Sequence, residues 1–306
     1  MAGASSAMTG WVSEAMSKVA WIGLGTMGYP IAGHLKARGK HDVTVFNRTR
    51  AKAETWVEQF GGSLAASPAE AVDRSEFVFT CVGNDDDLRA VTLGSDGAFR
   101  SLGKGAIFVD HTTASATIAR ELYEAARARG AGALDAPVSG GQSGAEGGTL
   151  TVMVGGDAED FGKAKPVIEA YARAVNLIGP AGSGQLTKMV NQICIGGLIE
   201  ALAEALHFAK AAKLDVAKVI GTISKGAAQS WQMDNRWRTM IEGKFDFGFA
   251  VDWVRKDFAI VLEEARINGA SLPVTTLVDQ FYAEIQGMGG GRWDTSSLIA
   301  LLERRG

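Results

Sequence analysis

Short apolar runs alternate with stretches that carry apolar residues at helical spacing over residues 18–180. Apolar runs of this kind, bounded by glycine or polar residues, are typical of buried strands. The predicted strands are Val19–Ile22, Val43–Phe46, Ser63–Ala66, Phe77–Val82, Ala106–Asp110, Ala133–Ala136 and Leu150–Val154. Helices are predicted after Gly28, over Ala51–Phe60, from Ser67-Pro68, after Asn84, and over Ile118–Gly130 and Phe161–Ala172. This alternation predicts an α/β domain with a doubly wound, mainly parallel sheet.

The pattern changes after Pro180, where helical spacing continues to the end of the chain without a convincing strand. The first and longest helix is predicted from Gly184 to about Lys213, followed by helices that include Val251–Gly269 and Val274–Gln286. We therefore expect a flexible leader at 1–17, a sheet domain at 18–180 and an all-helical domain at 181–306 that includes the long interdomain helix.

The composition excludes several classes of protein. The 306 residues are 46% hydrophobic and 21% charged, with a net charge of −3, so no polyanion-binding surface is indicated. Cys81 and Cys194 form no C-x-x-C motif, which fits a reducing, cytoplasmic compartment. The histidines form no zinc-binding pattern, and we expect no metal. We also expect no membrane span, because no apolar run approaches the ~20 residues that cross a bilayer, and residues 1–17 do not resemble a signal peptide.

The stretch Lys18–Gly28 reads K-V-A-W-I-G-L-G-T-M-G and places three glycines between a strand and a helix. Gly23 allows a sharp turn out of the strand. Gly25 has no Cβ, so that a pyrophosphate can approach the backbone, and Gly28 allows close packing of the helix. Free N–H groups at the start of the helix favour phosphate. The stretch therefore predicts a dinucleotide site of the Rossmann type, with candidate contacts from Gly23, Leu24, Gly25, Thr26, Met27 and Gly28.

The segment Asn47-Arg48-Thr49 follows the second strand, where a Rossmann unit meets the adenosine ribose. An acidic residue there would bind the ribose hydroxyls and repel a 2′-phosphate. This chain has Asn47 and Arg48 instead, and a guanidinium can bind a phosphate through paired hydrogen bonds. The segment favours NADP over NAD; the alternative is that Arg48 and Arg50 are solvated charges on a loop.

A glycine-rich segment, Asp135–Gly148, interrupts the alternation of strands and helices. Its Ser139, Gly140 and Gly141 offer a hydroxyl and bare backbone N–H groups, which suit a carboxylate or another oxyanion. Taken alone, the segment is better explained as a flexible glycine loop.

The long helix carries Lys188, Asn191 and Gln192 in an otherwise apolar stretch. Residues three and four apart face the same side of a helix, so the amine and the amides share one stripe. A buried lysine must be paired or must lose its proton easily.

Four stretches, in this order, resemble the β-hydroxyacid dehydrogenases, which include 3-hydroxyisobutyrate dehydrogenase, tartronate semialdehyde reductase and the glyoxylate and succinic semialdehyde reductases. They are G-L-G-T-M-G at Gly23–Gly28, D-A-P-V-S-G-G at Asp135–Gly141, G-S-G-Q-L-T-K-M-V-N-Q at Gly182–Gln192, and W-V-R-K-D-F at Trp253–Phe258. The resemblance covers about residues 18–304. It implies a Rossmann domain followed by an all-helical domain, and an NAD(P)-dependent enzyme that interconverts a small β-hydroxy acid and its semialdehyde.

The resemblance also implies roles for single residues. Lys188 would be the general acid/base, and Asn191 or Gln192 would orient the reacting oxygen of the substrate. Both amides stay open, because many relatives carry Asn at the position of Gln192. The substrate carboxylate would be bound by Ser139, Gly140 and Gly141. Thr113 would lie near both the nicotinamide and the substrate. Val82 and Lys256 would contact the cofactor, and Asn47, Arg48 and Thr49 resemble the NADP-preferring members.

Hydride transfer to an aldehyde builds negative charge on its oxygen, and an ammonium can stabilise that charge and donate a proton. The expected partner is a small carboxylated aldehyde or hydroxy acid. An imine reductase using the same cofactor cleft is an alternative, although imine reductases usually replace the lysine. A non-catalytic nucleotide sensor is a third possibility, against which Lys188 and the intact Ser139–Gly141 loop argue.

Three further expectations concern the helical domain. Gly182–Gly184 would be the hinge between domains. Ser230–Trp237 would line the substrate pocket or a subunit contact, or pack in the core, and Trp293 and Asp294 would close the far side of the pocket. The long apolar helices predict association into a homodimer or homotetramer.

Overall fold

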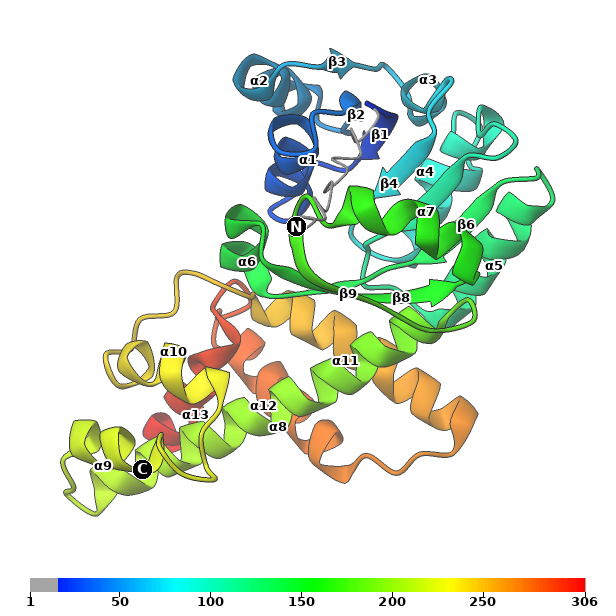
Figure 1. The fold of residues 1–306 in the computed structure, drawn as a ribbon. Coiled ribbons are helices and arrows are strands. Elements are labelled where there is room, and N and C mark those ends of the chain that lie inside the picture. Colours follow the sequence, from blue (N-terminus) through cyan, green and yellow to red (C-terminus); the bar gives the residue numbers. More distant parts are fainter. Residues whose placement is uncertain (1–15, 306) are drawn as a thin grey trace, which may run out of the picture.

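The computed structural model describes residues 16–305, in a half built on a sheet and a half built of helices (Figure 1). Residues 1–15 of the predicted leader lie outside the described residues. The strands are β1 (Lys18–Ile22), β2 (Asp42–Phe46), β3 (Ser63–Leu64), β4 (Phe77–Thr80), β5 (Ile107–Asp110), β6 (Gly132–Asp135), β7 (Val138–Ser139), β8 (Leu150–Gly156) and β9 (Ala172–Gly179). The helices of this half are α1 (Gly28–Ala37), α2 (Arg50–Phe60), α3 (Pro68–Val72), α4 (Asp85–Leu93), α5 (Ala116–Arg127), α6 (Gly141–Gly147) and α7 (Ala158–Ile168).

The strands form one sheet in the order β3-β2-β1-β4-β5-β6-β8-β7, with β9 paired to β8. The first six strands in this order are parallel. β8 runs antiparallel to β6 and β7, and β9 is parallel to β8. The strand order reverses between β1 and β4, and a sheet of this kind binds ligands beyond the carboxyl ends of its strands at that point. The predicted doubly wound α/β fold is thus confirmed.

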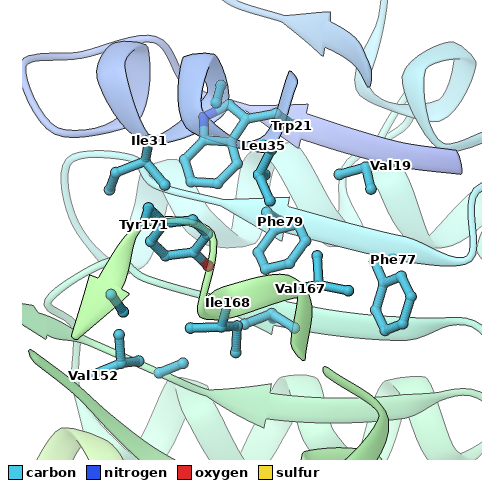
Figure 2. Packing of buried hydrophobic residues seen from close by; sticks show 14 of the residues in the cluster. Val19, Trp21, Ile31, Leu35, Phe77, Phe79, Val152, Val167, Ile168 and Tyr171 are labelled. Atoms are coloured by element: carbon cyan, nitrogen blue, oxygen red, sulfur yellow. The ribbon is translucent and has the colours of Figure 1, made fainter. Parts of the chain in front are cut away.

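Two apolar cores cover the faces of the sheet. Alternate residues of a strand point to opposite faces, so Val19 and Trp21 enter one core while Ala20 and Ile22 enter the other. In the first core, the rings of Trp21 and Phe79 stack with their centroids 5.6 Å apart (Figure 2). Each core is closed by the apolar side of the helices on that face, which fixes the positions of the loops at the carboxyl ends of the strands.

The structure differs from the sequence prediction in two segments. The predicted loop Asp135–Gly148 contains β7 and the short helix α6. Glycine disfavours helix, but His34 Nε2 lies 3.0 Å from the carbonyl oxygen of Ala145, and Arg38 donates a 3.1 Å hydrogen bond to that of Gly147. These contacts from α1 satisfy carbonyls at the end of α6. Tertiary contacts therefore stabilise a helix that the local sequence does not predict.

The second difference is β9, which the sequence analysis missed. The predicted helix Phe161–Ala172 ends at Ile168, and β9 follows as an outer strand beside β8. Its buried positions, Ala172 and Val175, are separated by the exposed Arg173 and a half-buried residue. A strand buried on part of one face has no continuous apolar run, which is why it resembled a surface segment.

The helical half consists of α8 (Ser183–Ala211), α9 (Val216–Ile223), α10 (Trp231–Ile241), α11 (Val251–Asn268), α12 (Pro273–Gly287) and α13 (Leu298–Arg305). The first turns of α8 contact β8 and β9, and its later turns pack against α10 to α13. Figure 1 shows α8 passing beneath the sheet and continuing into the helical half. One helix therefore belongs to both halves, as predicted from residue 184 onward.

By length and composition alone, α8 could cross a membrane, contrary to our expectation from the apolar runs. An 18-residue window of α8 has a mean hydropathy of 1.3, and 44% of that window is buried inside the protein. The core helix of a folded domain passes the same test. Its buried face also carries Lys188, Gln192 and Glu200. Packing against both halves accounts for the buried face of α8, whereas Val190, Leu198 and Phe208 on the same helix are exposed.

Candidate functional site

The three glycines after β1 occupy three different environments. Gly23 has a φ of +101°, and a Cβ there would lie 2.2 Å from the carbonyl oxygen of Cys81. Gly28 is equally restricted, since a Cβ would lie 2.0 Å from the carbonyl oxygen of Gly23. Gly25 faces open space, with nothing within 4 Å of a Cβ. No side chain among the described residues caps the start of α1. The residues therefore fit a dinucleotide, whose pyrophosphate would lie against Gly25 and the N–H groups of α1.

The segment after β2 lies beside this turn. The side-chain oxygen of Asn47 accepts a hydrogen bond from the Leu24 N–H at 2.9 Å, and its NH₂ group donates to the Thr49 carbonyl at 2.9 Å. Asn47 thus fixes the loop to the glycine turn. Arg48 projects into solvent and pairs with Asp87 at 3.1 Å. Arg48 is therefore an exposed cation beside the glycine turn.

Two further loops meet the helical half through one lysine. The Lys256 ammonium, on α11, donates hydrogen bonds to the carbonyl oxygens of Thr113 at 2.6 Å and Gly83 at 3.3 Å. The N–H of Val82 donates to the Thr112 hydroxyl at 3.0 Å, which joins the same two loops. The predicted cofactor residues Val82, Thr113 and Lys256 are thus brought to one place, between β4, β5 and α11.

The segment that begins at the end of β6 is fastened along the first turns of α8. The carboxylate of Asp135 accepts hydrogen bonds from the N–H groups of Gly182 at 2.7 Å and Gln185 at 2.8 Å. One turn later, the Lys188 ammonium donates to the Val138 carbonyl at 2.9 Å. The loop that starts at Ser139 and the face of α8 that carries Lys188 therefore form one rigid unit.

These contacts lie at the predicted hinge Gly182–Gly184, which stays a prediction. Gly182 is the residue before α8, with a φ of +92°, and its N–H is held by Asp135. Gln185 adds a second attachment, because its side chain accepts from the Ala114 N–H at 3.1 Å and donates to the Thr112 carbonyl at 2.7 Å. The start of α8 is therefore hydrogen-bonded to the ends of β5 and β6.

A chain of hydrogen bonds runs across the floor of the site from Ser139 to Lys256. The Ser139 hydroxyl donates to Asn191 Oδ1 at 3.3 Å, and Asn191 Nδ2 donates to Gln192 Oε1 at 2.8 Å. Gln192 Nε2 donates to Asp257 Oδ2 at 2.6 Å, and Asp257 Oδ1 lies 3.1 Å from Lys256 Nζ. Every donor in this chain points toward the carboxylate of Asp257, which orients both amides.

Lys188 is buried, with 8% of its surface exposed. Burial lowers its pKa to about 8, because the charged form loses hydration; the carboxylate of Asp257 raises the pKa and the ammonium of Lys256 lowers it. An amine with a pKa near 8 is present in both protonation states at neutral pH. The arrangement can therefore donate a proton to an oxygen held near Ser139, or accept one from it.

The sequence analysis missed three residues of this site. It quoted Asp257 within W-V-R-K-D-F without giving it a role, and it gave none to Asp135 or Gln185. Their partners lie 65, 47 and 73 positions away along the chain. Spacing within one helix cannot reveal such partners; an acidic residue at an otherwise buried helix position was the available signal for Asp257.

Trp293 and Asp294 do not close the site as predicted. Asp294 is fully buried in the helical half, where it accepts from the Phe249 N–H at 2.9 Å and pairs with Arg236 at 3.2 Å. Trp293 packs on Phe245 with centroids 5.8 Å apart. The segment Ser230–Trp237 is divided between a buried Met233 and an exposed Trp231, and Trp237 packs against the core of the helical half. These residues stabilise the helical half.

Between residues 16 and 305, no group of three or more His, Cys, Asp or Glu residues is arranged to bind a metal ion. A cavity of about 430 Å³ lies beside the site, with Lys256, Met189, Asn84 and Ser115 among its lining residues. Lys188 and Ser139 do not line it. The groups that can transfer or orient a proton, Lys188, Asn191, Gln192 and Asp257, lie where β6, α8 and α11 meet.

Both halves of the chain match known protein families. Residues 18–179 match the model of the NAD binding domain of 6-phosphogluconate dehydrogenase, and residues 182–302 match that described as the NAD-binding domain of NADP-dependent 3-hydroxyisobutyrate dehydrogenase. An uncharacterized oxidoreductase of Shewanella frigidimarina is 63% identical over 94% of this chain and 99% of its own. The 2-hydroxy-3-oxopropionate reductase of Escherichia coli is 32% identical over 94% and 97%.

Solved structures show the same fold. The 3-hydroxyisobutyrate dehydrogenase of Mycobacterium tuberculosis, solved with L-serine, has a TM-score of 0.86 at 28% identity, covering 94% of this chain and 99% of that chain. An imine reductase from Pseudomonas sp. has a TM-score of 0.61 at 19% identity, covering 94% and 100%, and shares the fold alone.

Proposed function

Because this chain is an oxidoreductase of the β-hydroxyacid dehydrogenase family, we propose that it interconverts a small β-hydroxy acid and its semialdehyde, with NADP preferred over NAD. One observation carries this proposal: the buried Lys188 is held against the strand segment that leads into Ser139. The members that the comparisons name act on small hydroxy acids or semialdehydes. A cytoplasmic location and a homodimer or homotetramer remain predictions from the sequence.

Lys188 is proposed as the general acid/base. When bound, a nicotinamide cofactor exchanges a hydride with the reacting carbon. During reduction, the Lys188 ammonium stabilises the charge that develops on the aldehyde oxygen and then donates a proton to it. During oxidation, the neutral amine accepts the proton of the alcohol. The pKa of about 8 supports both directions near neutral pH.

The substrate carboxylate is proposed to bind at Ser139, Gly140 and Gly141. The two glycines are exposed, with φ values of +133° and +62°, and a Cβ on Gly141 would have nothing within 4 Å. The backbone at this point is therefore open to a ligand. Because Lys188 is held to the adjoining strand, a carboxylate bound here would place the reacting carbon at a fixed distance from the amine.

Of the two candidate amides, Asn191 is proposed to contact the substrate. It is half-buried and bonded to Ser139, and its NH₂ group has a second hydrogen besides the one donated to Gln192. Gln192 is buried between Asn191 and Asp257. Gln192 therefore transmits the orientation set by Asp257, while Asn191 faces the substrate.

The decisive experiment measures NADPH oxidation with pairs of substrates. Succinic semialdehyde, methylmalonate semialdehyde, tartronate semialdehyde and glyoxylate are compared with butanal and propanal, which lack the carboxylate, and with cyclic imines. We expect turnover with at least one carboxylated aldehyde and a loss of at least about a hundredfold in kcat/KM for the analogue that lacks the carboxylate, since the donors that bind the carboxylate lose their partner when it is absent. Faster reduction of cyclic imines than of every carboxylated aldehyde would contradict the proposal.

A further inference from the structure

The cation proposed for the adenosine ribose already has an anionic partner. Arg48 Nη1 lies 3.1 Å from Asp87 Oδ1, and the two side chains are 88% and 34% exposed. The pair joins the loop after β2 to the first turn of α4, which follows β4; β2 and β4 lie on either side of β1 in the sheet. A carboxylate therefore lies next to the place where a ribose phosphate would have to bind.

The backbone of Asp87 is fixed at the start of α4, and its carboxylate lies between two loops. Its own N–H donates to the side-chain oxygen of Asn84 at 2.8 Å, which caps the start of α4. Its second carboxylate oxygen, Oδ2, would lie 2.6 Å from a Cβ at Gly83, so it rests on bare backbone. One oxygen is thus directed at Arg48 and the other at the loop after β4.

We propose that Asp87 sets the cofactor preference of this enzyme by competing with the 2′-phosphate of NADP for Arg48; this inference rests on the proposed function. A phosphomonoester carries close to two negative charges at neutral pH. It must displace Asp87 from Arg48 and then remain beside that carboxylate. NAD has a hydroxyl at this position, and that hydroxyl can donate a hydrogen bond to the carboxylate of Asp87. Asp87 therefore weakens the binding of NADP but not that of NAD. The preference for NADP that Arg48 creates becomes smaller.

The neighbouring Asp86 provides a matched control. It lies in the same first turn of α4 and carries the same charge, but its side chain is 96% exposed and pairs with Arg89 at 3.6 Å. Asp86→Asn and Asp87→Asn change the net charge and the charge at the start of α4 equally. Only Asp87→Asn removes the competitor for Arg48.

The experiment measures dissociation constants of NADPH and NADH for the full-length protein by titration calorimetry, at 0.05 M and 0.5 M salt. Exposed charge pairs contribute little, so we expect Asp87→Asn to tighten NADPH binding by about threefold to tenfold while NADH binding stays the same or weakens. This gain should shrink at 0.5 M salt, where screening is strong. Asp86→Asn should leave the ratio of the two constants unchanged within about twofold.

Two results would overturn the inference: an equal change of the ratio in both variants, or NADPH binding that is unchanged or weaker in Asp87→Asn. Thermal unfolding of each variant shows whether the start of α4 is intact. A wild-type protein that binds both nucleotides but reduces no carboxylated aldehyde would contradict the proposed substrate and leave the role of Asp87 standing. A wild-type protein that binds neither nucleotide would contradict both.

Discussion

Lys188 Nζ donates a 2.9 Å hydrogen bond to the carbonyl oxygen of Val138, the residue directly before Ser139. The bond ties the proposed proton donor to the strand that carries the proposed carboxylate site. A carbonyl oxygen accepts from an amine in either protonation state, so it can hold Lys188 in place throughout a reaction without fixing its charge.

The first prediction concerns Lys188 itself. Lys188→Met keeps the length and apolar character of the side chain but removes the amine. We expect kcat to fall by about a thousandfold, the range of general acid/base catalysis, while the dissociation constant of NADPH changes less than about twofold. Lys163→Met, at an exposed lysine of α7, is the control. A variant that retains a tenth of the wild-type turnover would show that another group supplies the proton.

The second prediction concerns pH and Asp257. The pKa of Lys188 is about 8, so aldehyde reduction, which needs the ammonium, should decline above about pH 8, and alcohol oxidation should rise with pH until about 8.

Asp257 raises the pKa of Lys188. Asp257→Asn should therefore move both midpoints to lower pH and reduce kcat by about tenfold or more, because the amides lose their orientation. Glu263→Gln, at an exposed acid of the same helix, should move neither midpoint. Identical pH profiles for Asp257→Asn and wild type would refute the assignment.

The third prediction separates two glycines of one turn. Gly25→Val places a side chain in open space, so the free energy of unfolding should change by less than about 0.5 kcal/mol, the usual limit for surface substitutions. It should weaken NADPH binding at least about tenfold, because the pyrophosphate must approach that backbone. Gly28→Ala should instead destabilise the fold by about 1–3 kcal/mol, the usual cost of overpacking, since its Cβ would meet the Gly23 carbonyl. Urea unfolding and nucleotide titration of both variants check the pair; equal losses of stability would contradict it.

The fourth prediction concerns Asp110, at the end of β5. Burial raises the pKa of its carboxyl to about 7, although Oδ1 accepts from Thr80 and Thr112; Oδ2 has no partner. The folded state then keeps a proton that the unfolded chain releases at about pH 4, so this group costs stability progressively as pH rises from about 4 to about 7. Asp110→Asn removes that cost. The difference in the free energy of unfolding between the variant and wild type should therefore grow in favour of the variant by on the order of 2 kcal/mol from pH 5 to pH 8. Urea unfolding at both pH values measures it, and an equal difference at the two would exclude a raised pKa.

The sequence pattern predicted those parts of the fold that depend on residues close together in the chain. The different environments of Gly23, Gly25 and Gly28 follow the order predicted from the strand–turn–helix pattern, and the long helix begins one residue before its predicted start. The helix α6 and the strand β9 were not predictable in this way. α6 is stabilised by His34 and Arg38 from another helix, and β9 by pairing with β8.

The candidate site shows the same division. The stripe of Lys188, Asn191 and Gln192 could be predicted, because three residues on one helix have a fixed relation to one another. The partner that orders their amides could not, since Asp257 reaches Gln192 across 65 residues of chain. Periodicity identifies which face of a helix is buried, but not which other element lies against it.

The attachment of Asp135 to Gly182 and Gln185 also bears on how such an enzyme can diverge. The amine, the carboxylate loop and the nucleotide turn all lie on one scaffold, up to the third turn of α8. The helices from α9 onward contribute Lys256 and Asp257 to that scaffold, but Lys188 lies on α8. Insertions and side-chain changes in α9, α10, α12 and α13 can therefore alter the helical half without moving Lys188 relative to the proposed carboxylate site at Ser139.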